Sequence, residues 1–276
     1  IDKLRSAYSE LETENHSGFR PISIFPGVEI SVDCGVHILA ILSEDKGCSN
    51  ISGLLGAVGI KEKYGSCEIC TKTSVNGVIS EIYDSGGIAI PAHVDDSKGI
   101  FKELSGQTLA KILEMDEIIA MELIDKSYPK PELYESKKLN WSEILGSDSH
   151  HPTKVSECNS KYPGSHFTWI KMTKPTLEGL RLALLDGNGI SIKRSDEFFE
   201  NPNKFEHFII ESIIVENACY MGNGNSFECK FSPWLNTIIG GRGIGKSTII
   251  EFIRLCLQRT GDIPYSIKND LEKYCK

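Results

Sequence analysis

The segment Pro26–Leu42 has the sequence PGVEISVDCGVHILAIL, and its pattern decides how the N-terminal part of the chain is interpreted. Two short apolar runs, Val28–Val32 and Val36–Leu42, flank a polar turn, which predicts two adjacent strands. Glu29 lies inside the first run, and His37 begins the second half of the pattern. A carboxylate in a buried strand is costly unless it is compensated, so a metal ion beside a strand-end imidazole is one explanation. The alternative is a solvent-facing glutamate and a hydrogen-bonded core histidine.

The composition is that of an ordinary globular protein. Of the 276 residues, 40% are hydrophobic and 25% are charged, and the formal net charge is −8. This length allows one large domain and part of another. No apolar run approaches the roughly 20 residues of a membrane span, so we expect no membrane association. The acidic balance excludes a wholly basic surface, and any contact with nucleic acid must therefore be local.

Nine cysteines are scattered along a chain that shows no secretory signal. This odd count predicts reduced thiols and a cytoplasmic protein. Cys67 and Cys70 form a CxxC pair, but a structural zinc ion needs four ligands, and no second pair follows at the spacing of a zinc finger. We therefore expect a loop with incidental thiols there, and a zinc ribbon is the minor alternative.

Apolar runs alternate with helical patterns between residues 1 and 195. Helices are predicted at residues 1–15, 51–55, 75–83, 108–115, 131–138 and 176–185, and strands at 22–25, 88–92, 118–123, 143–146 and 167–172. Such alternation is typical of parallel β/α units, in which chemistry gathers at the C-terminal ends of the strands. His93, Asp148 and His150 each follow a predicted strand. The pattern therefore predicts an α/β domain with its site at one edge of the strands.

Imidazole and carboxylate side chains recur at these strand ends. The candidate metal ligands are Glu29, His37, His93, Asp148 and His150. Such groups bind manganese, zinc or iron, and adjacent metal ions suit phosphoester hydrolysis, because one ion generates hydroxide and both stabilise the attacking and leaving oxygens. Further candidates, as ligands or as residues that support the ligands, are Asp95, Asp96, Glu122, Asp125 and His151.

The phrases PGVEIS, HILAIL, IAIPAHVD and ILGSDSHHP resemble successive motifs of the PHP (polymerase and histidinol phosphatase) metallophosphoesterases. The resemblance implies a distorted β/α barrel with up to three metal ions. It implies that Glu29 bridges two ions and that His37 and His93 share one ion with it. It also implies that Asp148 binds the ion across the bridge and His150 the third ion, so that Glu29, Asp148 and His150 are catalytic. The HxH motif that opens the family pattern has no counterpart before Glu29, so we expect a barrel truncated at its N-terminus.

A second motif lies near the C-terminus, where GGRGIGKST fits GxxxxGK[ST] in full. It follows an apolar strand predicted at 235–239 and precedes an amphipathic helix predicted at 247–257, which is the context of a phosphate-binding P-loop. Two further strands are predicted at 208–215 and 227–231. In this motif backbone N–H groups and the helix N-terminus hold phosphate, Lys246 neutralises it, and the Ser247 hydroxyl binds Mg²⁺, so ATP and Mg²⁺ are the expected ligands. The predicted nucleotide-binding residues are Gly240, Gly241, Arg242, Gly243, Ile244, Gly245, Lys246, Ser247 and Thr248.

The segment NTIIGGRGIGKSTIIEFIRLCL resembles the N-lobe of SMC/RecF-like ABC-type ATPases, and the combination resembles the TrlF-type PHP–ATPase family. TWIKMTKPTLEGLRLALLDG resembles the segment between the two domains of that family. The expected domains are therefore a PHP-like barrel (1–195), a linker (196–206) and the first part of an ATPase lobe (207–276). We expect an internal fragment of a longer protein, because the first residue is Ile1 and the last follows the predicted helix of a new domain.

These resemblances imply a cytoplasmic, metal-dependent nuclease that hydrolyses nucleic-acid phosphodiesters and is gated by an ATPase. They further imply a homodimer formed through the ATPase domain and a role in DNA repair or phage defence. Two alternatives stay open: an ATP-switched nucleic-acid-binding module with a non-catalytic barrel, and a small-molecule phosphatase. No Walker B carboxylate or signature motif follows Ser247, so the sequence assigns ATP binding but not ATP hydrolysis.

Overall fold

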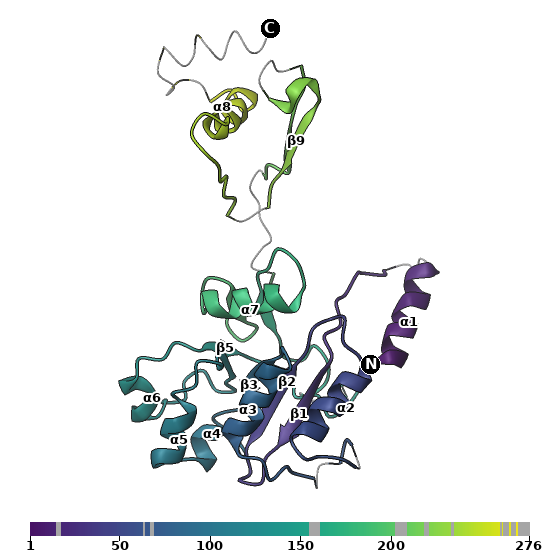
Figure 1. The fold of residues 1–276 in the computed structure, drawn as a ribbon, viewed down its shortest axis with the longest axis vertical. Coiled ribbons are helices and arrows are strands. Elements are labelled where there is room, and N and C mark those ends of the chain that lie inside the picture. Colours follow the sequence, from purple (N-terminus) through teal and green to yellow (C-terminus); the bar gives the residue numbers. More distant parts are fainter. Residues whose placement is uncertain are drawn as a thin grey trace. The chain divides into compact units, whose positions relative to one another are not determined.

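The computed structural model describes residues 1–14, 18–62, 64–66, 69–154, 161–201, 209–217, 221–232 and 235–259, with residues 261, 265 and 269. The chain divides into two compact units, Ile1–Lys204 and Phe205–Lys276. This division falls inside the segment 196–206 that the sequence predicts to be a linker. Both units combine helices and strands, so the protein is of the mixed α/β class (Figure 1). Among the described residues, no helix is long and apolar enough to cross a membrane.

A three-stranded sheet lies at the centre of the first unit. It consists of β1 (Gly27–Ser31), β2 (His37–Ile41) and β3 (Ile88–Pro91), and both pairings are antiparallel. The predicted pair of adjacent strands in the segment Pro26–Leu42 is confirmed. The prediction of parallel β/α units is wrong for this sheet, because β2 and β3 pair antiparallel although two helices lie between them in the chain. The short turn between β1 and β2 also leaves no room for the crossover that parallel neighbours require.

Helices cover both faces of this sheet. On one face Ile30, Ile38 and Ala40 pack in a core with α2 (Cys48–Ala57) and α3 (Val75–Asp84). On the other face Ile88 and Ile90 pack in a second core with α7 (Leu177–Asp186). Because side chains alternate along a strand, one sheet separates two apolar cores. The remaining helices of this unit are α1 (Asp2–Thr13), α4 (Ile100–Glu103), α5 (Gly106–Ile112) and α6 (Glu132–Ser136).

Two smaller sheets complete the first unit. In one, β4 (Ala120–Glu122) pairs with β5 (Ser142–Ile144) in parallel. In the other, β6 (Thr168–Ile170) pairs antiparallel with β7 (Ile192–Arg194). The described strands therefore form small separate sheets without a closed barrel. The strand predicted at residues 22–25 is not formed, and α4 and β7 were not predicted.

The elements described in the second unit include an antiparallel pair of strands and an 11-residue helix. The strands are β8 (Ser212–Val215) and β9 (Phe227–Lys230), joined through the short helix η1 (Gly222–Gly224), and the helix is α8 (Lys246–Cys256). The strand predicted at residues 235–239 is not formed: no described residue pairs with it, and Leu235 and Ile239 are exposed. The described cysteines are free thiols, and Cys67 of the CxxC pair lies outside the described residues.

Candidate metal centre

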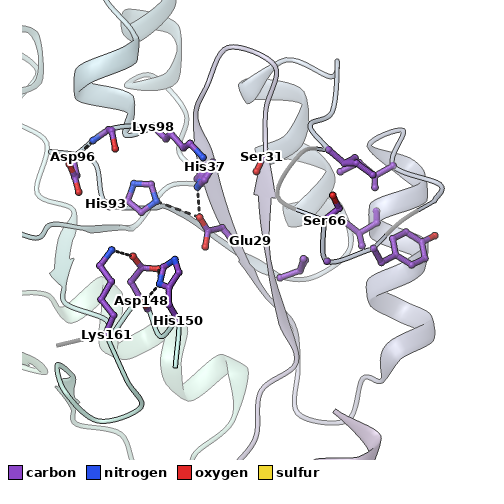
Figure 2. Close-up of a pocket in the computed structure, with 17 residues that line it drawn as sticks. Glu29, Ser31, His37, Ser66, His93, Asp96, Lys98, Asp148, His150 and Lys161 are labelled. Atoms are coloured by element: carbon purple, nitrogen blue, oxygen red, sulfur yellow. Dashed lines mark hydrogen bonds and ion pairs between the residues drawn. The ribbon is translucent and has the colours of Figure 1, made fainter. Parts of the chain in front are cut away.

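The register of β1 and β2 brings Glu29 and His37 together. Ser31 pairs with His37 and Glu29 pairs with Leu39, so Glu29 and His37 are diagonal neighbours on the same face of the sheet. The Nδ1 atom of His37 contacts Glu29 Oε1. The Nε2 atom of His93, which follows β3, lies 3.4 Å from the same oxygen (Figure 2). Glu29 from β1, His37 from β2 and His93 from the segment after β3 thus converge on one point.

The backbone around His93 is tightly constrained. Its φ angle is 29°, a left-handed value that is uncommon for a residue other than glycine. The backbone amide of His93 donates a hydrogen bond of 3.0 Å to the Glu122 carboxylate, and its carbonyl accepts one of 2.9 Å from the Asp96 amide. Lys98 (φ 66°) and Asp148 (φ 41°) are also left-handed, and all three line the same pocket. Strained conformations held by surrounding hydrogen bonds are characteristic of functional sites.

The donor atoms of Glu29, His37 and His93 suit a divalent metal ion. They lie within 4.8 Å of one another, which is close enough for one ion to contact all three. The Nδ1 atoms of His37 and His93 are buried, and neither has a hydrogen bond among the described residues, although His37 Nδ1 lies against Glu29 Oε1. Buried polar atoms without a partner are rare and call for an explanation, and a bound ion supplies one. Two imidazole nitrogens and one carboxylate oxygen are ordinary ligands of zinc, manganese or iron.

The protonation states of this cluster are coupled. The hydrogen bond with His93 lowers the pKa of Glu29, and the same bond raises the pKa of His93. Burial lowers the pKa of His37, although the carboxylate of Glu29 opposes this shift. A neutral His37 can donate its lone pair to a metal ion, whereas a protonated His93 must first release its proton.

Asp148 and His150 line the same pocket, which has a volume of about 440 Å³, but they do not belong to the three-residue cluster (Figure 2). Lys161 Nζ lies 2.6 Å from Asp148 Oδ2, so an ammonium group already faces this carboxylate. His150 Nδ1 lies 2.7 Å from the backbone carbonyl oxygen of Asp148. Lys161 was not among the predicted site residues, since no motif marks a lysine in this part of the chain.

The other candidates have different roles in the structure. The Asp95 carboxylate is buried and accepts hydrogen bonds from the amides of Ile124 (2.8 Å) and Asp125 (2.7 Å), so it holds the loop after β4. Glu122 is buried and holds His93 through the backbone, and burial raises its pKa. Of these further candidates, Asp96 lines the pocket. The other four do not: Asp95, Glu122, Asp125 and His151.

Apolar side chains also line the pocket. They come from β1, from α2 and from the loop after α2, and they are Val28, Leu55, Ile60, Tyr64 and Ile69. Tyr64 is 52% exposed and contributes an aromatic ring to this lining. The pocket therefore combines charged side chains with apolar ones that an attached organic group can contact.

The predicted phosphate loop leads directly into α8. Gly243 (φ 85°) and Gly245 (φ 90°) adopt left-handed conformations that favour glycine, and Gly245 caps the N-terminus of the helix. Lys246 Nζ donates hydrogen bonds to the carbonyl oxygens of Gly240 (2.7 Å) and Gly241 (2.5 Å). The lysine thus folds back over its own loop, at the place where the motif would hold phosphate.

No protein-family model, curated protein or solved structure matches this chain.

Proposed function

We propose that the first unit is a metal-dependent phosphoesterase with a PHP-type architecture, which hydrolyses nucleic-acid phosphodiesters. The observation that carries this proposal is the convergence of Glu29, His37 and His93 in a pocket that also contains Asp148. These three residues would hold the ion, which supplies a Lewis acid and a nucleophilic hydroxide when it is bound. The apolar lining with Tyr64 favours a nucleotide substrate, since aromatic side chains stack on bases.

For the second unit we propose binding of ATP and Mg²⁺ at the segment Gly240–Thr248. The support is the complete GxxxxGK[ST] motif at the start of α8, together with the left-handed Gly243 and Gly245. Nucleotide binding there would gate the phosphoesterase.

The test measures metal content and diester hydrolysis in the same preparations. Protein stripped with a chelator should hydrolyse neither bis(p-nitrophenyl) phosphate nor single-stranded nucleic acid, and addition of Mn²⁺, Zn²⁺ or Fe²⁺ should restore both activities. His37→Ala should lower metal affinity by about 10-fold to 100-fold, because it removes one of three protein ligands. His166→Ala is the control, since His166 does not line the pocket. Equal metal binding by the wild-type protein and folded His37→Ala would refute the metal centre.

A further inference from the structure

Two lysines of the pocket lie on either side of the candidate metal centre. Lys161 approaches from the segment after Asp148, and Lys98 follows the turn that carries His93. Figure 2 shows the end of Lys98 beside His37 and the end of Lys161 beside Asp148. The function proposed above uses neither side chain.

We propose that Lys98 and Lys161 bind the phosphoryl group of the substrate beside a single metal ion, and that the Lys161 ammonium is the cation that Asp148 holds. This inference deepens the proposed function and rests on it for the identity of the site. The chemistry recognised is a tetrahedral phosphate anion, which a diester, a monoester or inorganic phosphate can supply.

The position of Lys161 is set by a close ion pair. Its Nζ atom lies 2.6 Å from Asp148 Oδ2, within the range of a charge-assisted hydrogen bond. The Asp148 carboxylate is outside the cluster formed by Glu29, His37 and His93. With an ammonium group on its carboxylate, Asp148 needs no metal ion to balance its charge, and an ammonium group carries three N–H donors.

The position of Lys98 is set by its backbone. Its carbonyl oxygen accepts a hydrogen bond of 3.0 Å from the His37 amide, and its own amide donates one of 3.3 Å to Glu103 Oε1. This arrangement holds Lys98 in a left-handed conformation (φ 66°) next to the candidate metal centre. Within the described part of the chain, no carboxylate forms an ion pair with its ammonium group, which is therefore available to an anion from solvent.

The charges of the pocket support anion binding only when a metal ion is present. The carboxylates that line it are Glu29, Asp96 and Asp148, and the lysines are Lys98 and Lys161. A divalent ion would change the net charge of these groups from negative to positive. It would create a positive site between the two ammonium groups. A lysine ammonium group binds phosphate as a point charge. It can therefore bind the phosphoryl group whichever organic groups are esterified to it.

The experiment measures the affinity of the metal-loaded protein for inorganic phosphate by calorimetry, and the number of bound metal ions by elemental analysis. Lys98→Met and Lys161→Met remove the charge and keep the length of the side chain. Each should weaken phosphate binding by at least about 10-fold, the usual value of one hydrogen bond to a charged group. Lys161→Arg should retain most of the affinity. Lys111→Met, which removes an exposed charge on α5 outside the pocket, should change nothing.

Metal stoichiometry and activity separate this inference from the function on which it rests. One ion per chain in the wild-type protein supports Lys161 as the cation at Asp148, and a second ion bound there would overturn it. Wild-type phosphate affinity in both folded methionine variants, with diester hydrolysis intact, would overturn the inference but not the proposed function. Lysine-dependent phosphate binding without ester hydrolysis would overturn the function only. KM is also compared between each methionine variant and the wild-type protein for two substrates, p-nitrophenyl phosphate and the diester. A larger rise in KM for p-nitrophenyl phosphate would identify a monoester as the preferred source of the phosphoryl group, and a larger rise for the diester would identify a diester.

Discussion

The buried carboxylate of Glu122 accepts a hydrogen bond of 3.0 Å from the backbone amide of His93 and so ties β4 to the turn that carries a candidate metal ligand. This carboxylate has little room to move. A Cβ atom at Gly146, on the segment after β5, would lie 2.5 Å from Glu122 Oε1. A side chain at position 146 would therefore displace the carboxylate that holds the backbone amide of His93.

Gly146→Ala should therefore displace Glu122 and loosen His93. We expect the free energy of unfolding to fall by about 1–3 kcal/mol, measured by denaturant titration, because of overpacking and a disturbed buried hydrogen bond. Metal affinity should fall as well. Gly53→Ala on α2 is the control, because nothing lies within 4 Å of the added methyl group. A folded Gly146→Ala variant with unchanged metal affinity would show that Glu122 does not position His93.

Two adjacent histidines should differ in their effect on hydrolysis. His150 lines the pocket and contacts the Asp148 carbonyl oxygen at 2.7 Å, whereas His151 does not line it. If the first unit is a phosphoesterase, His150→Ala should lower kcat for a diester by at least about 10-fold, the smallest usual effect of a catalytic proton-transfer or ligand group. His151→Ala should leave kcat within about twofold, as expected for an exposed residue away from the site. Equal losses in the two variants would contradict a role for His150.

The ion pair between Arg194 and Asp196 should make the first unit sensitive to acid. Arg194 is 2% exposed, and it donates hydrogen bonds to Asp196 (2.8 and 3.0 Å) and to the carbonyl oxygens of Leu123 and Ile124 at the end of β4. The hydrogen bond from Arg194 lowers the pKa of Asp196 in the folded state. The stabilisation is therefore present above the unfolded pKa, about 3.9, and is lost as the pH falls through the lower folded value.

Asp196→Asn should lower the free energy of unfolding by about 1 kcal/mol at neutral pH. The value is small because the carboxylate is partly exposed to solvent. The difference between variant and wild type should shrink as the pH falls below about 4, where the wild-type carboxylate becomes protonated. Urea denaturation at a series of pH values measures both effects. Asp116→Asn, which replaces an exposed carboxylate, is the control. A pH-independent difference would mean that the charge of Asp196 is not what stabilises the fold.

Lys246→Ala should abolish ATP binding, because its ammonium group is the cation of the phosphate loop. In the structure this group donates to the carbonyl oxygens of Gly240 and Gly241, so a nucleotide phosphate would take over contacts that the loop now provides. Fluorescent-nucleotide titration measures the loss, with Lys230→Ala on β9 as the matched control in the same unit. Unchanged affinity in Lys246→Ala would refute the phosphate-loop assignment. Loss of bound metal in the same variant would mean that the two units are not independent.

Elements with strong local signals were predicted well. The helices α3 and α7 have apolar periodicity, and each begins at a hydroxyl side chain, Ser74 or Thr176, that accepts a hydrogen bond from a backbone amide in the first turn. Short elements such as α4 and β7 have too few residues for a period to show, and they were missed. The apolar segment 235–239 matched a strand in composition, but a strand also needs a partner for its backbone, which composition does not reveal.

The sequence by itself determined which residue types were available for chemistry: Glu29, His37 and His93 at the ends of apolar runs, and GGRGIGKST before an amphipathic helix. These signals are local, since strand alternation and motif spacing involve neighbours along the chain. Only the tertiary structure decided that strands β1, β2 and β3 are antiparallel, that Glu122 holds the amide of His93, and that Lys161 faces Asp148. Such contacts join residues far apart in the chain, and they depend on how the loops close around two packed cores, for which no local pattern carries information.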